Sequence, residues 1–431
     1  MSTAKEPIRA VKGTHDLYED ELVTWRWVEN TARHMFARFG YGELRTPVLE
    51  ETQLFVRGVG EGTDIVEKEM YAFRDKDKAE TSLCLRPENT AGVVRALIQA
   101  GRLFADAEER LYYLGPMFRR ERPAKGRYRQ FHQLGVEVFG LDGPTIDVEV
   151  MGLLHALLQA LGLEGVELRV NSLGGPEDRA RHRQALYAYF TPLRDQLCSD
   201  CQRRLETNVL RILDCKVPED KALAAGAPST LSHLGADAMT HFESVQRGLA
   251  DLGVTFTVDP SLVRGLDYYT GTVFEAVATT GLGAQNAVAG GGRYDLLVEE
   301  LGGRPTPAIG FAAGIERIVM LLVEAGRAAK PSPPLLMLVG ADDVGRREAH
   351  RLAHALRLAG AAVEVDHRGR SVKAQMKRAD RAAVSHVIVL GQREIEGKTA
   401  QVKEMSTGAV REVSLEPAAL LTGLGTGNQP S

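Results

Sequence analysis

The segment 117–140 carries the groups in this chain that are best suited to bind an anion. Between Arg119 and Arg129 it has five arginines and one lysine against a single acid, Glu121. Guanidinium groups pair well with carboxylate and phosphate oxygens, so this run favours an anionic ligand. A solvated basic turn is the alternative, because exposed loops are commonly polar without having a function.

The residues that follow the basic run favour a ligand site over a simple turn. Segment 129–140, RQFHQLGVEVFG, alternates with the period of a β-strand, and 111–118, LYYLGPMF, is suited to be its partner strand. One face then carries Phe131, Gln133, Gly135, Glu137 and Phe139, and the other carries His132, Leu134, Val136 and Val138. We therefore predict that Phe131, Gln133 and Glu137 line one pocket from which His132 is absent.

Two glycine-containing segments could bring further polar groups to this site. In RGLDYY (264–269), strict alternation would place Arg264 and Tyr269 on opposite faces, so a shared ligand requires a turn, which Gly265 permits. In AVAGGGRYD (287–295), three consecutive glycines let the backbone approach a ligand closely. This run lacks the spacing of a GxxxxGKS phosphate-binding loop.

Two acidic residues near expected helix starts each allow two interpretations. Glu88 in RPENTAG (86–92) is either a favourable first-turn acid or a ligand for an ammonium group. Glu316 and Arg317 follow a short predicted strand, at a helix start that attracts anions. An exposed ion pair beside core residues explains the second pattern equally well.

The cysteines argue against a metal centre. Cys198 and Cys201 form a CxxC pair and Cys215 lies further on, but a structural zinc site needs four ligands. No second CxxC exists and the next histidine is His233, so we expect no protein-bound zinc.

The elements that must position these residues fall into two groups. In 1–325, a helix at 25–39 and many strands without regular helical crossovers indicate an antiparallel sheet flanked by helices, with a helical insertion at about 170–253. A proline-rich linker, 326–334, precedes a unit at 335–422 in which strands alternate with helices, as in a small α/β domain. The tail 423–431 is expected to be disordered.

Composition restricts the class of protein. With 44% hydrophobic and 26% charged residues, the chain is typical of a soluble globular protein, and no apolar run approaches the roughly 20 residues that span a bilayer. Four cysteines in 431 residues do not suggest a disulfide framework, so a cytoplasmic location is expected. The net charge of −4 argues against a general nucleic-acid coat.

Taken together, these segments resemble the histidyl-tRNA synthetases of bacteria, a class II aminoacyl-tRNA synthetase family, over nearly the full length. GYGELRTPVLEETQLF (40–55) resembles the first class II motif, with Pro47 at the dimer-interface strand. The hairpin at 117–140 resembles the second motif and GFAAGIERI (310–318) the third. RGLDYY and AGGGRYD resemble the histidine-specific signatures, and 335–422 resembles the anticodon-binding domain of several class II enzymes.

The resemblance implies a role for each residue of the expected site. Arg119 and Arg264 would act on the α-phosphate of ATP as catalytic cations. The resemblance also implies ATP binding by Arg119, Glu121, Arg127, Phe131 and Arg317. It implies histidine binding by Glu88, Thr90, Gln133, Glu137, Tyr268, Tyr269 and Tyr294.

The implied reaction is the Mg²⁺-assisted formation of histidyl-adenylate from L-histidine and ATP, followed by transfer to the 3′ end of tRNA(His). A homodimer with no membrane contact is also implied. Asn89 stands where the family usually has glycine, and we expect its tolerance of positive φ to preserve the turn. The alternatives are a catalytically inactive regulator of histidine biosynthesis and a class II synthetase for another amino acid; the intact RGLDYY segment and the C-terminal unit argue against the regulator.

Overall fold

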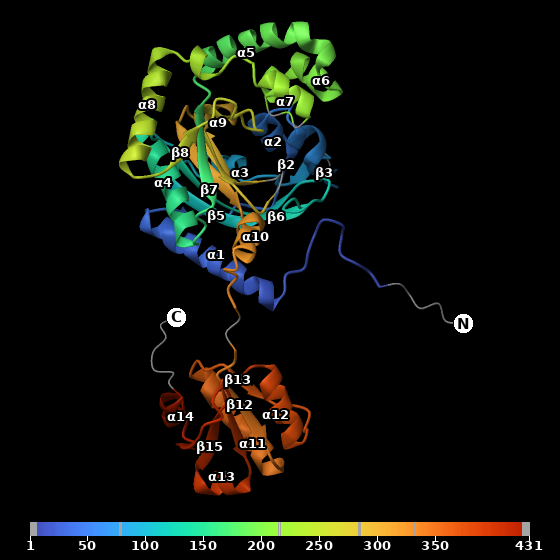
Figure 1. The fold of residues 1–431 in the computed structure, drawn as a ribbon, viewed down its shortest axis with the longest axis vertical. Helices are drawn as coiled ribbons and strands as arrows, with labels where there is room; N and C mark the ends of the chain where they lie inside the picture. Colours follow the sequence, from blue (N-terminus) through green and yellow to red (C-terminus); the bar gives the residue numbers. More distant parts are fainter. Residues whose placement is uncertain are drawn as a thin grey trace, which may run out of the picture. The chain divides into compact units, whose positions relative to one another are not determined.

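The protein is described by a computed structural model, which covers residues 7–76, 80–213, 215, 217–282, 286–330 and 333–424. The chain divides into two compact units, Met1–Ala329 and Lys330–Ser431, which are described separately (Figure 1). Most of the predicted tail and part of the predicted linker, at 331–332, lie outside the described residues.

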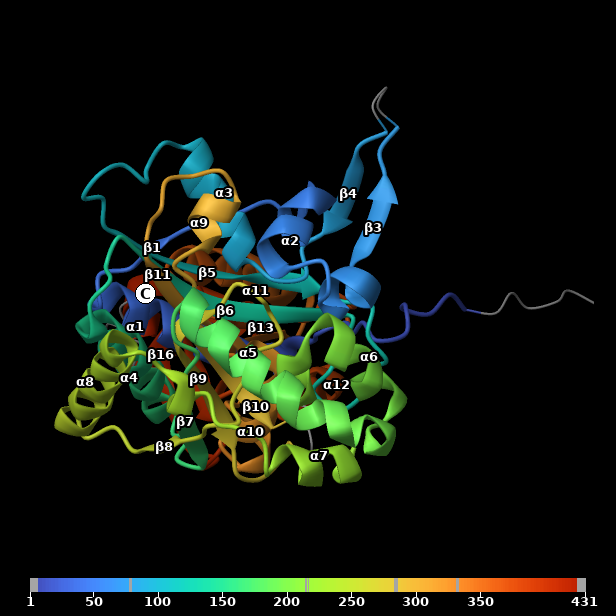
Figure 2. The same ribbon diagram turned by 90° about the horizontal axis from the view of Figure 1, so that it is seen from above.

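An eight-stranded sheet forms the centre of the first unit (Figure 2). Inner neighbours are antiparallel, as predicted, whereas the outermost pair at each edge is parallel. The strand order is β1 (Gly42–Glu43), β5 (Glu109–Phe118), β6 (Gln130–Phe139), β11 (Ala308–Gly314), β10 (Ala287–Arg293), β9 (Thr270–Ala278), β7 (Val166–Ser172) and β8 (Phe256–Val258).

Helices cover one face of this sheet. The helices are α1 (Glu19–Arg38), α4 (Pro144–Ala160), α8 (Ala236–Asp251) and α10 (Ile315–Glu324). Helix α1 buries Trp25, Val28, Ala32 and Phe36, whose three- and four-residue spacing places them on one side. They share a core with the aliphatic face of β6, as the alternation in that strand predicts.

The opposite face packs against shorter elements and carries the pocket residues. A second core joins this face to α2 (Thr52–Val59), α3 (Thr90–Gln99) and α9 (Leu297–Glu300). Beside it, a small sheet has the order β2 (Leu49–Glu51), β4 (Ser82–Leu85) and β3 (Tyr71–Arg74), and a π-helical turn, Ile65–Glu69, follows α2.

The helical insertion is shorter than its composition indicates. It comprises α5 (Pro176–Phe190), α6 (Ser199–Thr207), α7 (Pro218–Ala224) and the 3₁₀ turns Thr191–Gln196, Val209–Ile212 and Leu231–His233 (Figure 1). The predicted start at 170 is wrong, because 170–172 complete strand β7 in the main sheet. At the other end, α8 buries Phe242, Val245 and Leu249 in the main core. Composition predicts helices but not the core that each helix joins.

The second unit is a small α/β domain, as predicted. Its strand order is β13 (Val363–Val365), β12 (Leu336–Gly340), β14 (His386–Leu390), β15 (Thr399–Glu404) and β16 (Val410–Ser414). The first three strands are parallel, and the last two form an antiparallel hairpin. The helices are α11 (Asp343–Leu358), α12 (Val372–Arg381), α13 (Gln392–Gly397) and α14 (Pro417–Gly423).

Candidate active site

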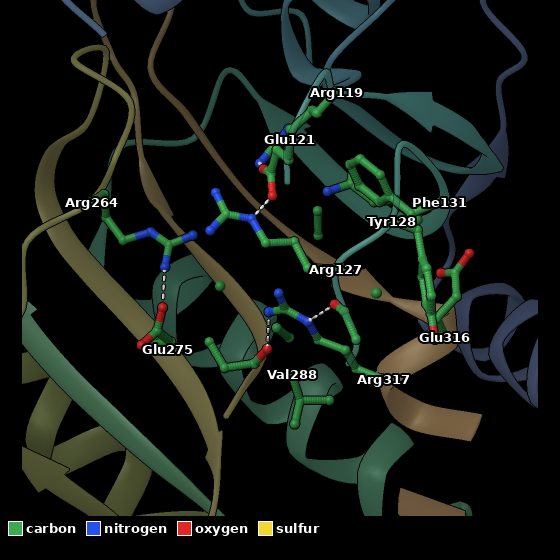
Figure 3. A pocket seen from close by; sticks show the side chains of 17 residues that line it. Arg119, Glu121, Arg127, Tyr128, Phe131, Arg264, Glu275, Val288, Glu316 and Arg317 are labelled. Atoms are coloured by element: carbon green, nitrogen blue, oxygen red, sulfur yellow. Dashed lines mark hydrogen bonds and ion pairs between the residues drawn. The ribbon is translucent and has the colours of Figure 1, made fainter. Parts of the chain in front are cut away.

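Two adjoining pockets lie on the face of the sheet opposite α1. The larger, here called the arginine pocket, has an open volume of about 770 Å³ and is lined by Arg119, Glu121, Gly126, Arg127, Tyr128, Phe131, Gln133, Arg264, Glu275, Ala287, Val288, Ala289, Gly290, Ala312, Gly314, Glu316 and Arg317 (Figure 3). The smaller, the glutamate pocket, measures about 450 Å³ and is lined by Glu88, Thr90, Tyr113, Arg119, Gln133, Glu137, Arg264, Leu266, Tyr268, Tyr269, Gly290, Tyr294, Gly310, Phe311 and Ala312. Arg119, Gln133 and Arg264 line both, so a ligand that spans the pockets would pass between them.

Strand β6 supplies both pockets from one face, as its alternation predicts. Phe131 and Gln133 line the arginine pocket, and Gln133 and Glu137 line the glutamate pocket, so the predicted single pocket is two adjoining ones. His132 lies on the other face, where its ring packs edge-on against Trp25 with centroids 5.0 Å apart. Period two therefore separates the ligand face from the helix-packing face.

Arg119 and Arg264 come to the junction from different elements. Arg119 follows β5; its Nε donates to the carbonyl oxygen of Pro87 at 2.9 Å and its guanidinium lies 5.2 Å from the ring centroid of Phe131. Arg264 lies in the loop before β9, and its Nη1 donates to Glu275 at 2.7 Å. Figure 3 shows the Arg264 guanidinium pointing into the space that Arg127 enters from the other side.

The other two arginines of the arginine pocket hold neighbouring oxygens. Arg127 contacts the Glu121 carboxylate through Nε and donates to Glu69 Oε1 at 3.2 Å through Nη2. Arg317 donates from Nε to the carbonyl oxygen of Gly126 at 3.0 Å and from Nη1 to that of Ala287. A phosphate oxygen can take the place of one of these protein oxygens, because each guanidinium has several N–H donors.

Glu137 is the buried acid of the glutamate pocket, with 1% of its surface exposed. Its carboxylate accepts a hydrogen bond from Thr90 Oγ1 at 2.8 Å and another from the Tyr294 hydroxyl. Burial raises the pKa of Glu137 to about 8, although these two donors lower it. A side chain at Gly310 would come within 1.9 Å of Glu137 Oε2, so this neighbour must be glycine.

Glu88 is an acid at a helix start, as the first of its two interpretations predicts. Its two carboxylate oxygens accept the backbone N–H groups of Thr90 at 2.7 Å and Ala91 at 3.1 Å, where α3 begins. It also lines the glutamate pocket, and burial raises its pKa. Capping the helix thus fixes the carboxylate at the pocket wall.

The RGLDYY segment turns as its predicted function requires. The Arg264 guanidinium lies 5.6 Å from the ring centroid of Tyr269, so both face one space. Gly265 does not have a positive φ, so the turn does not depend on its left-handed freedom. The need for glycine falls on Gly290 instead, because a Cβ there would meet Arg264 Nη1 at 2.3 Å.

The expected reason for tolerating Asn89 is wrong. Asn89 has φ −120°, which any residue can adopt, so positive φ is not what this position demands. Its Oδ1 instead accepts hydrogen bonds from the Thr46 hydroxyl and from Arg86 Nη1, the latter at 3.1 Å. Asn89 therefore ties the start of α3 to the segment that leads into β2.

The sequence did not single out several lining residues. Glu275 is the only charged residue in β9. This pattern could have singled it out, because an isolated acid in an apolar strand needs a partner. Tyr113 lies opposite Gly135 on the neighbouring strand. For Glu316 the sequence left two interpretations open, a helix start that attracts anions and an exposed pair with Arg317. In the structure its carboxylate accepts the His132 backbone N–H at 2.9 Å, a contact between residues 184 apart.

Comparison with known proteins places this geometry in a family. A family model for histidyl-tRNA synthetase matches residues 13–318, and one for an anticodon binding domain matches 335–419. The chain belongs to the histidyl-tRNA synthetase family. This result confirms the resemblance, the class II fold and the assignment as an ATP-dependent histidine–tRNA ligase.

Individual relatives match this chain over nearly its full length. Histidine–tRNA ligase of Dechloromonas aromatica (strain RCB) is 49% identical, with 95% of each chain covered, and that of Anaeromyxobacter sp. (strain K) is 48% identical, covering 96% of this chain and 100% of the relative. Apo S. aureus histidyl-tRNA synthetase superposes with a TM-score of 0.80 at 36% identity, covering 96% of this chain and 99% of that chain. No described helix has the length and apolar character needed to cross a membrane.

Proposed function

We propose that this member of the histidyl-tRNA synthetase family joins L-histidine to ATP across the two pockets and then transfers the histidyl group to the 3′ end of tRNA(His). One observation carries the assignment. A pocket lined by four arginines meets a pocket built around a buried glutamate, and Arg119 and Arg264 line both. ATP would occupy the arginine pocket and histidine the glutamate pocket.

The first step is attack of the histidine carboxylate on the α-phosphate, with diphosphate leaving. Both reactants are anions, so the reaction requires positive charge at the junction and close positioning of the reacting groups. Arg119 and Arg264 supply this charge from separate segments, before and after the helical insertion. The charge of the departing diphosphate would be neutralised by Mg²⁺ bound with ATP.

The remaining residues of the arginine pocket would hold the nucleotide. Phe131 and Arg317 would enclose the adenine ring, and Glu121 would accept a hydrogen bond from its amino group. Arg127 would hold the outer phosphates. Arg127 and Glu121 contact each other in the structure, so ATP binding requires this pair to separate.

The glutamate pocket would recognise histidine at both ends. Glu137 would accept the imidazole N–H, within a wall completed by Tyr268, Tyr269 and Tyr294. Glu88, Thr90 and Gln133 would bind the α-amino group. A buried acceptor of this kind rejects amino acids that leave it unpaired, because an unsatisfied buried polar group is costly.

Membership of the family also suggests the roles of the two units, the location of the protein and its oligomeric state. The 335–422 unit would bind the anticodon of tRNA(His), after a linker at 326–334, and the 1–325 unit would carry catalysis. The protein would act in the cytoplasm as a homodimer formed through the first motif and its small sheet. Leu49 on β2 and Phe73 on β3 are 44% and 48% exposed, which suits apolar surfaces covered by a partner.

The test of this proposal is histidine-dependent exchange of diphosphate into ATP by the purified full-length chain. Exchange with histidine, and none with other amino acids at equal concentration, is expected. Folded protein that binds histidine without exchange would instead support the regulator. Exchange with another amino acid would assign the chain to a different synthetase specificity.

A further inference from the structure

Four side chains in the helical insertion bring their metal-binding atoms together. The sulfur atoms of Cys198, Cys201 and Cys215 and a carboxylate oxygen of Asp220 all lie within 4.8 Å of one another. Cys198 is the residue before α6, Cys201 lies in its first turn, Cys215 follows the 3₁₀ turn after α6, and Asp220 lies on α7. Three separate segments therefore converge on one point.

The spacing of these atoms fits a tetrahedral ion. Zinc–sulfur bonds of about 2.3 Å and zinc–oxygen bonds of about 2.0 Å give tetrahedron edges of about 3.8 Å between sulfurs and about 3.5 Å between sulfur and oxygen. The Cys198 and Cys215 sulfurs are 4.0 Å apart, and Cys215 Sγ is 3.3 Å from Asp220 Oδ2. A disulfide requires about 2.05 Å between sulfurs, so the four atoms are spaced as ligands and not as a bonded pair.

Neighbouring donors support a negatively charged centre. The backbone N–H of Cys198 donates to Asp220 Oδ1 at 3.0 Å and holds the carboxylate in place. Arg204 Nη1 lies 4.0 Å from Cys201 Sγ, where its charge would balance part of the negative charge of a metal–thiolate centre. Groups that orient and charge-balance ligands in this way are typical of metal sites.

The apolar core of the insertion is small. Its own core contains nine buried residues, of which Cys201 and Cys215 are two. Such a small apolar cluster provides limited stability, and small structural units commonly gain a metal or disulfide for this reason. The pattern in the sequence predicted no zinc because it lacked a second CxxC, whereas the structure brings the Asp220 carboxylate to the three sulfurs as a possible fourth ligand.

We propose that Cys198, Cys201, Cys215 and Asp220 bind one structural Zn²⁺ ion in the insertion. Three thiolates select a soft divalent ion, and four protein ligands leave no open position for catalysis. Binding releases the three thiol protons to solvent and leaves a doubly negative centre beside Arg204. No redox step is involved.

The ion would position the insertion against the catalytic loop. Between Cys201 and Cys215, Asn208 donates to Asp267 Oδ1 at 3.0 Å and Arg211 donates to Asp64 Oδ2 at 2.8 Å. Asp267 belongs to the RGLDYY segment that carries Arg264 and Tyr269. The metal would thus fix the loop that leads to the junction of the two pockets without touching either substrate.

The decisive experiment measures metal in the untagged full-length chain, purified under reducing conditions without chelator. One zinc ion per chain is expected by mass spectrometry, in the native protein or after reconstitution. Replacement by Co²⁺ should give the thiolate charge-transfer and visible bands of a tetrahedral site. Folded protein that binds neither ion after reconstitution, or that contains a Cys198–Cys215 disulfide, would overturn the proposal.

Variants separate this site from accidental binding. Cys201→Ser should lose the ion, whereas Cys84→Ser, a buried cysteine outside the cluster, should keep it. Because Cys201→Ser can fail to fold, Asp220→Cys provides a second test that preserves all four ligands. Its Co²⁺ complex should show stronger thiolate absorption than the native complex. An unchanged spectrum would remove Asp220 from the ligand set and contradict the proposed site.

Discussion

The arginine pocket and the glutamate pocket share a wall but hold their charged groups in opposite ways. In the first, Arg127 binds two acids that a phosphate can replace, and Arg317 binds two carbonyl oxygens. In the second, Glu137 is buried and already bonded to Thr90 and Tyr294. The difference separates two tasks, because exchangeable cations suit a charged nucleotide and a fixed buried acceptor suits selection of one side chain.

The largest loss of activity should come from a substitution at the junction, where Arg264 lines both pockets. Arg264→Ala should lower the exchange rate by about 10³-fold, because it removes a cation from the transition state in a buried site. Histidine affinity, measured by calorimetry, should change less than about tenfold, since Glu137 and its donors remain. Exchange close to the native rate would remove Arg264 from its catalytic role.

Changing the fixed acceptor should affect one substrate only. Glu137→Gln should lower kcat/KM for histidine by about 10²-fold or more, because the amide offers a poorer acceptor to the imidazole and to Tyr294. KM for ATP should stay within about threefold of the native value, as the arginine pocket is intact. The exposed Glu61→Gln provides the matched control. Equal losses for both substrates would contradict the separation of tasks.

The acidity of Glu137 gives a smaller effect with a definite sign. Burial raises its pKa to about 8, so the acid is mostly neutral at pH 6 and becomes ionised as the pH rises. Only the ionised form accepts from the imidazole through either oxygen, and its share rises from about 1% at pH 6 to about half at pH 8, so histidine affinity should rise by up to about 50-fold. Part of that rise is the titration of histidine itself, whose pKa is about 6.5.

Glu137→Gln provides the correction for this titration. The pH dependence of histidine affinity that remains in this variant comes from the histidine ligand. Subtracting it from the pH dependence of the native protein leaves the contribution of the Glu137 carboxyl group. Folding stability changes in the opposite direction: a raised carboxyl pKa makes the ionised form unfavourable in the folded state, so this group destabilises the fold as the pH rises above its unfolded value. A subtracted profile that is flat between pH 6 and 8 would contradict the assignment.

The smallest effect concerns the support behind the glutamate pocket. Asn89→Gly removes the acceptor for Thr46 and Arg86, which should lower the thermal midpoint by about 2–6 °C, corresponding to one or two lost buried hydrogen bonds. Exchange should stay within about threefold of native, because φ at this position is ordinary and Glu88 still caps α3. An unchanged midpoint would show that the Asn89 contacts contribute nothing to stability.

The features that could be predicted from the sequence are those that a local pattern of residues determines. The alternation in 130–139 fixes which side chains of β6 share a face, and that prediction needed only the period of a strand. The repeated strand and helix signals in 335–422 likewise predicted the α/β unit. Neither result required knowledge of distant partners.

Long-range pairing was the part that could not be predicted. The bond between Glu316 and the backbone of His132, 184 residues away, depends on how strands and helices are arranged in space. The end of the insertion was misplaced because α8 is amphipathic and could have packed against either core. Asn89 was assigned the wrong reason because one of its two side-chain partners, Thr46, comes from a segment 43 residues away.

The most direct test of the central claim is a crystal structure with a stable sulfamoyl analogue of histidyl-adenylate. Its imidazole should lie against Glu137, its adenine beside Phe131 and Arg317, and its sulfamoyl group between Arg119 and Arg264. The Arg127–Glu121 contact should be broken. Adenine in the glutamate pocket, or a sulfamoyl group that contacts neither Arg119 nor Arg264, would contradict the assignment of the two pockets.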